Sequence, residues 1–337
     1  MEPPVPRHEV QFTRMIIAGD IGGTKTLIGL FEARDRRPAS IASRAYTTLD
    51  YPGLPDIIEA FYRDLGRRPA ITSAAFGVAG PVIDQTAEMT NIPWRVDATK
   101  LRGAFGFERI RLLNDLEAMA YSLPVLDSQE LHPLQPGTHR PDGNIALVAA
   151  GTGLGESVLH FVGGRYVPVA SEGGHTDFAA RTDRDLEFTR FLRGRYGRAE
   201  VEHVLSGPGL VNLADFTHAG ARCQSLGVGD SPDVPAEVTA SALGRRCPAC
   251  VEALEMFVTS YGATAGNLGL TAVTTGGVFL GGGIAPRILP ALEDGRFIDA
   301  FRDKGPMRSM MEAMPVSVIL NAEAGLLGAA VYANGAL

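Results

Sequence analysis

The feature that most constrains the fold of this chain is a strand–glycine turn–strand unit that occurs twice. Residues 15–18 are apolar, residues 26–31 are β-branched and apolar, and the turn between them reads Gly19-Asp-Ile-Gly-Gly-Thr24. Residues 144–150 form another apolar run, which enters the turn Gly151-Thr-Gly-Leu-Gly155 and an apolar return segment. A strand, a short glycine turn and a strand predict a β-hairpin, not the strand-to-helix connection of a Walker loop. One such hairpin in each half predicts a weak internal repeat.

Each glycine turn is suited to bind an anion. Adjacent glycines let backbone N–H groups converge on one point, because no Cβ atom obstructs them. In the first turn, Thr24 adds a hydroxyl group, and the carboxylate of Asp20 could hold a hydrated Mg²⁺. An ordinary hairpin turn of the same composition binds nothing, so this turn alone leaves both interpretations open.

The order of the other predicted elements indicates an α/β fold. The 337 residues, 45% of them hydrophobic, suffice for two domains with separate cores. The first hairpin is followed by a third strand at 41–47, a helix over 51–65 and a strand over 71–78. A short helix over 101–107 and a strand over 109–113 come next. This order requires a mixed sheet with helices packed on it.

Composition excludes several partners. The net charge is −7 and no dense Lys/Arg tract occurs, so we expect no nucleic acid partner. No apolar run is long enough to span a membrane, and residues 1–14 lack the apolar core of a signal peptide. We therefore expect no membrane partner, a cytoplasmic protein, and a flexible tail over residues 1–13.

Three cysteines, Cys223, Cys247 and Cys250, are few enough to suit a reducing compartment. Cys247-Pro-Ala-Cys250 has the spacing of a zinc knuckle, but no second pair accompanies it. His203, His218 and Cys223 are the residues that could complete a site. Because an isolated CxxC pair is a weak signal, we expect no structural zinc.

Seven short motifs, in the same order, resemble the bacterial glucokinase family within the hexokinase, actin and Hsp70-like ATPases. They are Gly19-Asp-Ile-Gly-Gly-Thr24, Gly77-Val-Ala-Gly-Pro81, Leu113-Asn-Asp-Leu-Glu-Ala118, Gly151-Thr-Gly-Leu-Gly155, Ser171-Glu-Gly-Gly-His175, Leu205-Ser-Gly-Pro-Gly-Leu210 and Gly281-Gly-Gly-Ile284. Two departures stand out. Lys25 replaces the asparagine expected for the family, and the zinc cluster typical of the related ROK sugar kinases is missing.

The resemblance implies a two-domain actin-like ATPase (ribonuclease H-like) fold, with mixed sheets, flanking helices and a central cleft. It places a small α/β domain over residues 14–125 plus 318–337 and a large one over 126–317. The last helix would pack on the N-terminal domain. The implied activity is ATP-dependent phosphorylation of D-glucose at its 6-hydroxyl.

Asp115 is the expected catalytic base, because it follows a buried strand and begins a helix at the edge of the expected cleft. An Asp in this place is commonly only a helix N-cap, which is the alternative. By resemblance, glucose is bound by Asn114, Asp115, Glu172, His175 and Glu202. Carboxylates and an imidazole favour a neutral polyol over an already phosphorylated sugar.

The nucleotide is expected at the glycine turns. Asp20 would position Mg²⁺, most simply through water, while Lys25 either approaches the phosphates or points to solvent. The residues expected to bind ATP are Gly19, Asp20, Ile21, Gly22, Gly23, Thr24, Gly151, Thr152, Gly153, Gly282 and Gly283.

Other functions of the same fold stay open at this point. The nearest is a kinase of fructose, mannose or an N-acetylhexosamine. A sugar-sensing repressor needs a helix-turn-helix, for which thirteen N-terminal residues are too few. An actin-like filament subunit leaves Asp115, Glu172 and His175 without a role. A homodimer is expected from the family and from the frequency of dimers among enzymes.

Overall fold

The computed structural model describes residues 14–89, 92–169, 171–221, 223 and 233–335. The chain divides into two compact units, one comprising Met1–Val125 with Glu323–Leu337 and the other Leu126–Ala322. Residues 1–13, expected to form a flexible tail, lie outside the described residues.

The first unit is built on one five-stranded sheet. Its elements are strands β1 (Met15–Ile21), β2 (Lys25–Glu32), β3 (Ala39–Thr47), β4 (Ser73–Val78) and β8 (Arg109–Asn114), a small sheet of β5 (Val82–Ile83), β6 (Thr86–Glu88) and β7 (Arg95–Asp97), helices α1 (Leu54–Leu65), α2 (Ala98–Phe105), α3 (Asp115–Ser122) and α11 (Ala324–Asn334), and 3₁₀ turns at Thr48–Asp50 and Leu123–Val125. The strand order is β3-β2-β1-β4-β8; β4 pairs in parallel with β1 and β8, and β2 pairs antiparallel with both β1 and β3.

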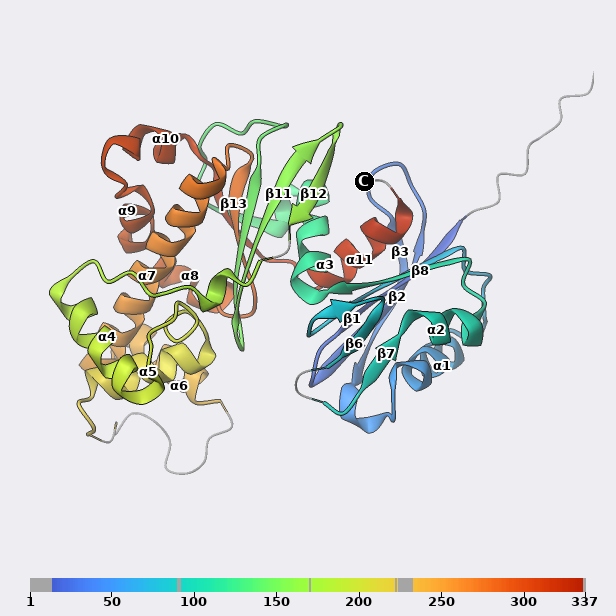
Figure 1. Ribbon diagram of the computed structural model, residues 1–337, viewed down its shortest axis with the longest axis horizontal. Helices are drawn as coiled ribbons and strands as arrows, with labels where there is room; N and C mark the ends of the chain where they lie inside the picture. The colour runs from blue at the N-terminus through green and yellow to red at the C-terminus, as the bar shows by residue number, and fades with distance from the viewer. Residues whose placement is uncertain (1–13, 90–91, 170, 222, 224–232, 336–337) are drawn as a thin grey trace, which may run out of the picture. The chain divides into compact units, whose positions relative to one another are not determined.

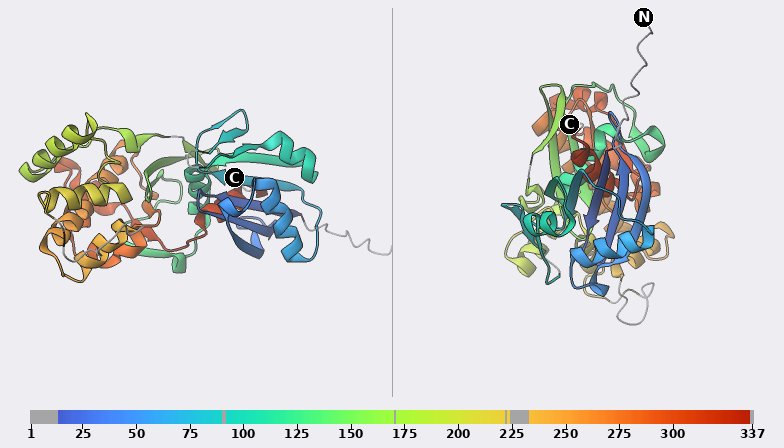
Figure 2. Two further views of the ribbon diagram at one scale, coloured as in Figure 1. Left: turned by 90° about the horizontal axis from the view of Figure 1, so that it is seen from below. Right: turned by 90° about the vertical axis from the view of Figure 1, so that its right-hand side faces the viewer.

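The two faces of this sheet pack against different helices, because side chains alternate along a strand. Ile17 and Ile21 of β1 belong to the apolar cluster shared with α1, whereas Ile16 and Ala18 belong to the cluster shared with α3 and α11. Figures 1 and 2 show α11, drawn in red, beside α3 and against this sheet. Asp20 has the same parity as Ile16 and Ala18, so its side chain lies on the α3–α11 face.

The second unit contains a six-stranded sheet and most of the helices. Its elements are β9 (Leu131–Gln135), β10 (Ile145–Ala150), β11 (Leu154–Val162), β12 (Arg165–Val169), β13 (Gly277–Gly281) and β14 (Val316–Ile319), helices α4 (Asp183–Tyr196), α5 (Gly207–Thr217), α6 (Val234–Leu243), α7 (Pro248–Ala272), α8 (Leu289–Leu292), α9 (Arg296–Arg302) and α10 (Arg308–Ala313), and 3₁₀ turns at Ser128–Glu130, Gly173–His175, Ala285–Ile288 and Gly305–Met307. The strand order is β12-β11-β10-β13-β14-β9.

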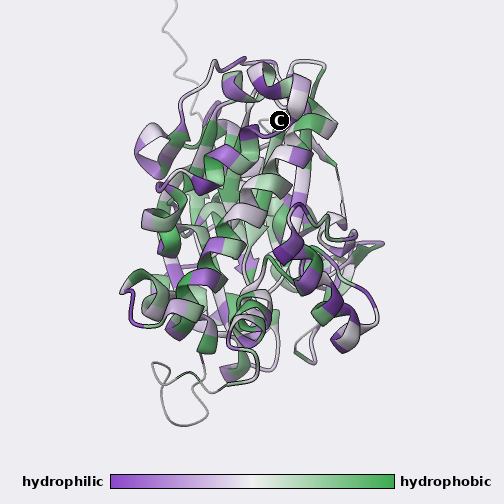
Figure 3. Cartoon of the chain, turned by 90° about the vertical axis from the view of Figure 1, so that its left-hand side faces the viewer, coloured by the Kyte–Doolittle hydropathy of each residue, from purple (hydrophilic) through white to green (hydrophobic). Residues whose placement is uncertain are grey.

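The long helix α7 organises the core of this unit. Its buried Phe257 and Tyr261 belong to one apolar cluster with strands β10, β13 and β14 and helices α5 and α9, and the Tyr261 hydroxyl donates to Val148 O at 3.0 Å. The helices of the unit carry both hydrophobic and hydrophilic residues (Figure 3). Among the described residues, no helix is long and apolar enough to cross a membrane.

The predicted repeat is present in the topology. The β1–β2 hairpin pairs in parallel with β4, and the β10–β11 hairpin pairs in parallel with β13 in the same way. The expected α/β class with two units and mixed sheets is confirmed. Residues 318–322, expected in the first domain, lie in the second unit. Residues 318 and 319 belong to β14, which is hydrogen-bonded between β13 and β9.

Candidate active site

The first glycine turn is a braced hairpin with an exposed end. Gly22 N donates to Lys25 O at 3.0 Å, which closes the turn between β1 and β2. The buried Thr48 supports it from behind, since its hydroxyl donates to Gly22 O at 2.8 Å and its N–H to Thr24 O at 3.0 Å. Thr24 and Lys25 are exposed. Thr48 is a structural contributor that the sequence patterns did not indicate.

Asp115 and Asp20 lie at the same edge of the first sheet. In the parallel strands β1, β4 and β8, Asp20 is paired with Gly77 and Gly77 with Leu113, so the carboxyl ends of the strands coincide. Asp115 follows β8 directly and begins α3. A Cβ on Gly77 would lie 2.8 Å from the Ala118 Cβ, so this glycine lets α3 pack closely on β4.

Asn114, not Asp115, is the N-cap of α3. The Asn114 Oδ1 accepts from Leu116 N at 3.0 Å and from Glu117 N at 3.4 Å. Its Nδ2 donates to Gly80 O at 3.2 Å, which fixes the amide against the Gly77–Pro81 segment. Asp115 is the first helical residue, and its Oδ1 accepts from Leu116 N at 2.8 Å. The N-cap is thus the neighbouring residue, and the two side chains share the Leu116 N–H.

The surroundings of Asp20 favour a cation. Burial and, next, the nearby charge of Asp115 raise the pKa of Asp20 to about 6, while Lys25 opposes the rise. The carboxylate also lies against the first turn of α11, where a Cβ on Gly325 would be 2.7 Å from the Asp20 Oδ2. Two carboxylates in one partly buried place offer the hard oxygen ligands that Mg²⁺ prefers. The residues present therefore fit a magnesium ion.

In the second unit, the glycine turn adjoins the start of α5. Gly207 N donates to Gly151 O at 2.8 Å, and Ser206 caps α5 by accepting from Gly209 N at 3.0 Å. This contact brings together two of the sequence motifs, the Gly151–Gly155 turn and the Ser-Gly-Pro-Gly segment. The positive end of the helix dipole and the glycine turn are both features of phosphate sites.

The third glycine motif lies beside the same turn. Strands β10 and β13 are parallel neighbours with Ala149 opposite Gly281, so the segments that follow them leave the sheet at one edge. Gly282 has a φ of +80° and no space for a Cβ, because it packs on the carbonyl of Ala150. Gly283 is exposed beyond it. The structure thus unites the two glycine segments that were expected to bind nucleotide in this unit.

Glu202 joins this turn to the Glu-Gly-Gly-His loop. Its Oε2 accepts from Leu154 N at 2.8 Å, and a Cβ on Gly153 would lie 2.6 Å from the same oxygen. Its backbone N–H donates to Gly174 O at 2.8 Å. Glu172 and His175 are exposed at the ends of the loop. The three expected sugar ligands of the second unit therefore belong to one connected surface.

His175 has an acidic partner that the sequence patterns did not reveal. Its Nδ1 lies 2.9 Å from the Glu200 Oε2, and this hydrogen bond raises the pKa of His175 and lowers that of Glu200. Arg198 holds both residues, since its guanidinium donates to His175 O at 3.0 Å and lies 3.4 Å from Glu200. Position 200 carries no signal beyond its closeness to Glu202 in the sequence.

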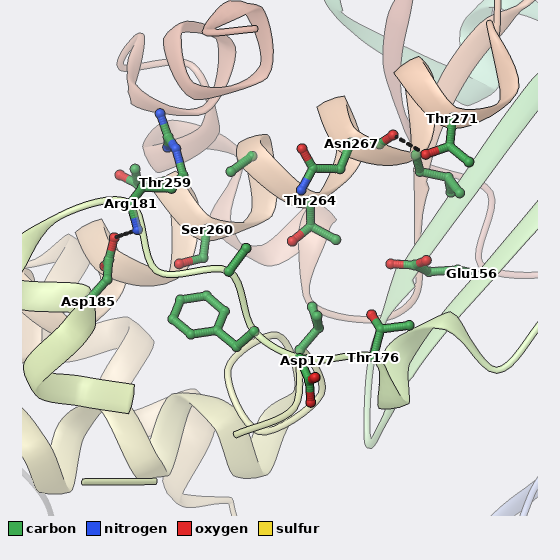
Figure 4. A pocket seen from close by; sticks show the side chains of 15 residues that line it. Glu156, Thr176, Asp177, Arg181, Asp185, Thr259, Ser260, Thr264, Asn267 and Thr271 are labelled. Atoms are coloured by element: carbon green, nitrogen blue, oxygen red, sulfur yellow. Dashed lines mark hydrogen bonds between the residues drawn. The ribbon is translucent and has the colours of Figure 1, made fainter. Parts of the chain in front are cut away.

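A cavity of about 270 Å³ lies behind this loop, within the second unit. Figure 4 shows polar side chains of α7 on one side and Thr176 and Asp177 on the other, with Glu156 from β11 between them. Burial raises the pKa of Glu156, whose carboxylate leaves no room for a Cβ on Gly173. None of the residues expected to bind sugar or nucleotide lines this cavity.

Comparisons with known proteins identify the family of this chain. A glucokinase of Nostoc punctiforme is 36% identical over 342 residues, covering 95% of this chain and 98% of that protein. A solved glucokinase from an Antarctic psychrotroph is 30% identical, with a TM-score of 0.86 over 96% of this chain and 100% of that one. A ROK family glucokinase of Streptomyces griseus, solved with glucose and AMPPNP, shares the fold at 21% identity and a TM-score of 0.64, over 95% of this chain and 99% of that one. The sequence also matches the profile described as Glucokinase over residues 17–336, so the chain belongs to the glucokinase family.

Proposed function

We propose that this chain transfers the γ-phosphoryl group of ATP to the 6-hydroxyl of D-glucose, the first step of glycolysis. The observation that carries the residue assignment is the position of Asp115. It follows a buried parallel strand, the N-cap of its helix is the neighbouring Asn114, and it lies at the same sheet edge as Asp20 and the first glycine turn. Membership of the glucokinase family supports the reaction itself.

Asp115 acts as the general base. Its carboxylate accepts the proton of the 6-hydroxyl as that oxygen bonds to the γ-phosphorus, and the bond to the bridging β–γ oxygen breaks to release ADP. A rigid strand–helix junction suits this role, because a base must be held within hydrogen-bond distance of one particular hydroxyl. Asn114 would donate a hydrogen bond to the sugar from its second amide N–H, because the first N–H donates to Gly80 O and the amide oxygen caps α3.

Three acidic or basic side chains of the second unit bind the sugar hydroxyls in this proposal. Glu172 and His175 are exposed at the ends of one tight loop. The bond between His175 Nδ1 and Glu200 orients the ring and directs Nε2 to the ligand. Glu202 anchors one oxygen on Leu154 N, so that its other oxygen can accept from a hydroxyl. Ionised acceptors strengthen such hydrogen bonds to neutral polyols.

The glycine turns bind ATP in this proposal, and Asp20 would hold Mg²⁺ through water. When bound, the ion offsets the charge of the phosphate oxygens. Thr24 and Lys25 are exposed at the end of the first turn, where their side chains can reach a phosphate. The proposed nucleotide contacts are Gly19, Asp20, Ile21, Gly22, Gly23, Thr24, Gly151, Thr152, Gly153, Gly282 and Gly283.

The test is a coupled assay of sugar 6-phosphate formation by the wild type and by Asp115→Asn, with glucose binding measured by calorimetry. We expect kcat to fall by about 10²–10⁴-fold while glucose binding is retained. The matched control is Asp56→Asn, which also removes a carboxylate from the first turn of a helix in the same unit. If Asp115→Asn keeps its turnover, Asp115 is not the base. If the wild type binds glucose without phosphorylating it, the kinase proposal fails.

The same assay distinguishes glucose from fructose, mannose and N-acetylglucosamine, the substrates of the nearest alternative. Sites that hydrogen-bond each hydroxyl discriminate strongly against a substrate whose hydroxyl is absent or misplaced. We expect glucose to have the highest kcat/KM. A higher value for another hexose would reassign the substrate while leaving the roles of the residues intact.

A homodimer and a cytoplasmic location complete the proposal. Closed two-fold dimers are the commonest assemblies of soluble enzymes. The three cysteines form no disulfide, which suits a reducing compartment. Light scattering on the purified chain tests the dimer, and cell fractionation tests the location.

A further inference from the structure

Four side chains with metal-binding atoms converge in the second unit, away from the site described above. They are His218, Cys223, Cys247 and Cys250, and their ligand atoms all lie within 4.8 Å of one another. His218 is the C-cap of α5, Cys223 lies in the segment that follows, and Cys247 and Cys250 flank the start of α7. Cys223 and Cys250 are buried, and Cys247 is partly buried.

Three of the distances between these atoms are close to those of a tetrahedral zinc site. Zn–S bonds of about 2.3 Å and Zn–N bonds of about 2.0–2.1 Å give edges of about 3.8 Å between sulfurs and about 3.6 Å between sulfur and nitrogen. The Cys223 and Cys250 sulfurs are 3.7 Å apart. The His218 Nε2 is 3.3 Å from the Cys247 sulfur and 4.0 Å from the Cys250 sulfur. Each of these three edges is within a few tenths of an ångström of the zinc value.

The Nδ1 atom of His218 makes the hydrogen bond that typically orients a metal-bound histidine. This atom lies 2.7 Å from Ala214 O, one turn earlier in α5. This bond places the ring proton on Nδ1 and leaves Nε2, which faces the Cys247 and Cys250 sulfurs, without a proton, as is usual for zinc-bound histidines. The hydroxyl of Thr217 donates to Ala249 O at 2.9 Å, so the ends of the two helices are fixed to each other beside the cluster.

A disulfide does not account for this cluster. Bonded sulfurs are about 2.05 Å apart, far shorter than the 3.7 Å between Cys223 and Cys250. A disulfide would also use only two of the three sulfurs and would leave the orientation of His218 unexplained. Three thiols and one imidazole match the closed Cys₃His set of structural zinc sites, and thiolates are poor ligands for Mg²⁺.

We propose that His218, Cys223, Cys247 and Cys250 bind one Zn²⁺ in a closed structural site. Binding releases the three thiol protons and forms three Zn–S bonds and one Zn–N bond. The ion joins the C-terminal end of α5 to the N-terminal end of α7. Because α5 begins at the Gly151 turn, the site fixes the helix whose first residues adjoin that turn.

This inference revises the expectation from sequence. The isolated Cys247–Cys250 pair is only a weak signal for zinc, and the structure brings it together with His218 and Cys223, two of the three residues that could complete a site. His203, the other candidate, is not among them; its ring stacks on Tyr196 at 4.1 Å between centroids.

The experiment measures zinc in the full chain, purified without chelators, by plasma mass spectrometry. We expect about one zinc ion per chain in the wild type. In Cys247→Ser and in Cys250→Ser the zinc content per chain should be lower by at least about tenfold. The matched control is His160→Gln, which removes an exposed histidine of β11 and should keep its zinc. Circular dichroism establishes whether each variant is folded.

A second measurement keeps the proposal testable if the cysteine variants do not fold. Wild-type protein, stripped of metal under reducing conditions, is titrated with Co²⁺, which gives intense visible absorption in tetrahedral thiolate sites. One equivalent of Co²⁺ should produce this spectrum, and Zn²⁺ should abolish it. A wild type that contains no zinc, takes up neither ion and keeps three free thiols would overturn the proposal, as would a Cys223–Cys250 disulfide found by peptide mass spectrometry.

Discussion

The substitution Asp20→Asn should raise the stability of the first unit and lower the catalytic activity. The carboxylate of Asp20 is partly buried beside Asp115, and these surroundings raise its pKa from 3.8 to about 6. Such a rise corresponds to about 3 kcal/mol of unfavourable free energy when the group is ionised in the folded state. Asn has the same shape and no charge, so the substitution should remove this cost.

The sign of the pH dependence follows from linkage. The folded state binds the Asp20 proton more tightly than the unfolded state, so the group's contribution to stability is fully present below about pH 4 and lost as the pH rises through about 6. We therefore expect Asp20→Asn to stabilise the first unit by about 1.5 kcal/mol at about pH 5 and about 3 kcal/mol at about pH 8. At the same time kcat should fall by about 100-fold or more, because the proposed magnesium ligand is lost.

The assay is urea unfolding followed by the fluorescence of Trp94. This residue is the only tryptophan and is buried in the first unit, so it reports the unit that contains Asp20. Asp35→Asn, which neutralises an exposed carboxylate of the same unit, is the control and should change stability little at either pH. If Asp20→Asn is no more stable than the wild type at about pH 8, or gains equally at both pH values, the argument from burial is wrong.

Three further substitutions test the packing and the electrostatics of the site. Gly77→Ala should destabilise the first unit by about 1–3 kcal/mol, because its Cβ would lie 2.8 Å from the Ala118 Cβ. Gly103→Ala, in α2 with open space around it, should instead stabilise by about 0.5–1 kcal/mol; equal effects in urea unfolding would refute this contrast. Glu200→Gln removes the partner of His175, so the pKa of His175 should fall towards its ordinary value and KM for glucose should rise. NMR titration of the His175 ring measures this pKa. An unchanged pKa would contradict the assignment of Glu200 as the orienting partner of His175.

Much of the fold could be predicted from the sequence because it depends on local spacing. The segments at 15–18 and 26–31, separated by a glycine turn, predict the β1–β2 hairpin without reference to the rest of the fold. The same holds for the β10–β11 hairpin, for α1 and for the strand–helix junction at Asn114 and Asp115. Each of these features lies within one continuous segment of the chain, where periodicity and turn chemistry determine the conformation.

Other properties depend on residues that are far apart in the sequence, and only the tertiary structure decides them. The raised pKa of Asp20 depends on its burial and on the charge of Asp115, which the parallel pairing of β1, β4 and β8 brings to the same sheet edge. The pairing of His175 with Glu200 and the assembly of the four zinc ligands arise from loop and helix packing. Likewise, β14 joins the second sheet by pairing with β13 and β9. The apolar pattern of β14 predicts a strand but does not predict which sheet the strand joins. Periodicity determines which face of an element is buried, whereas the topology of the sheets determines which side chains then meet.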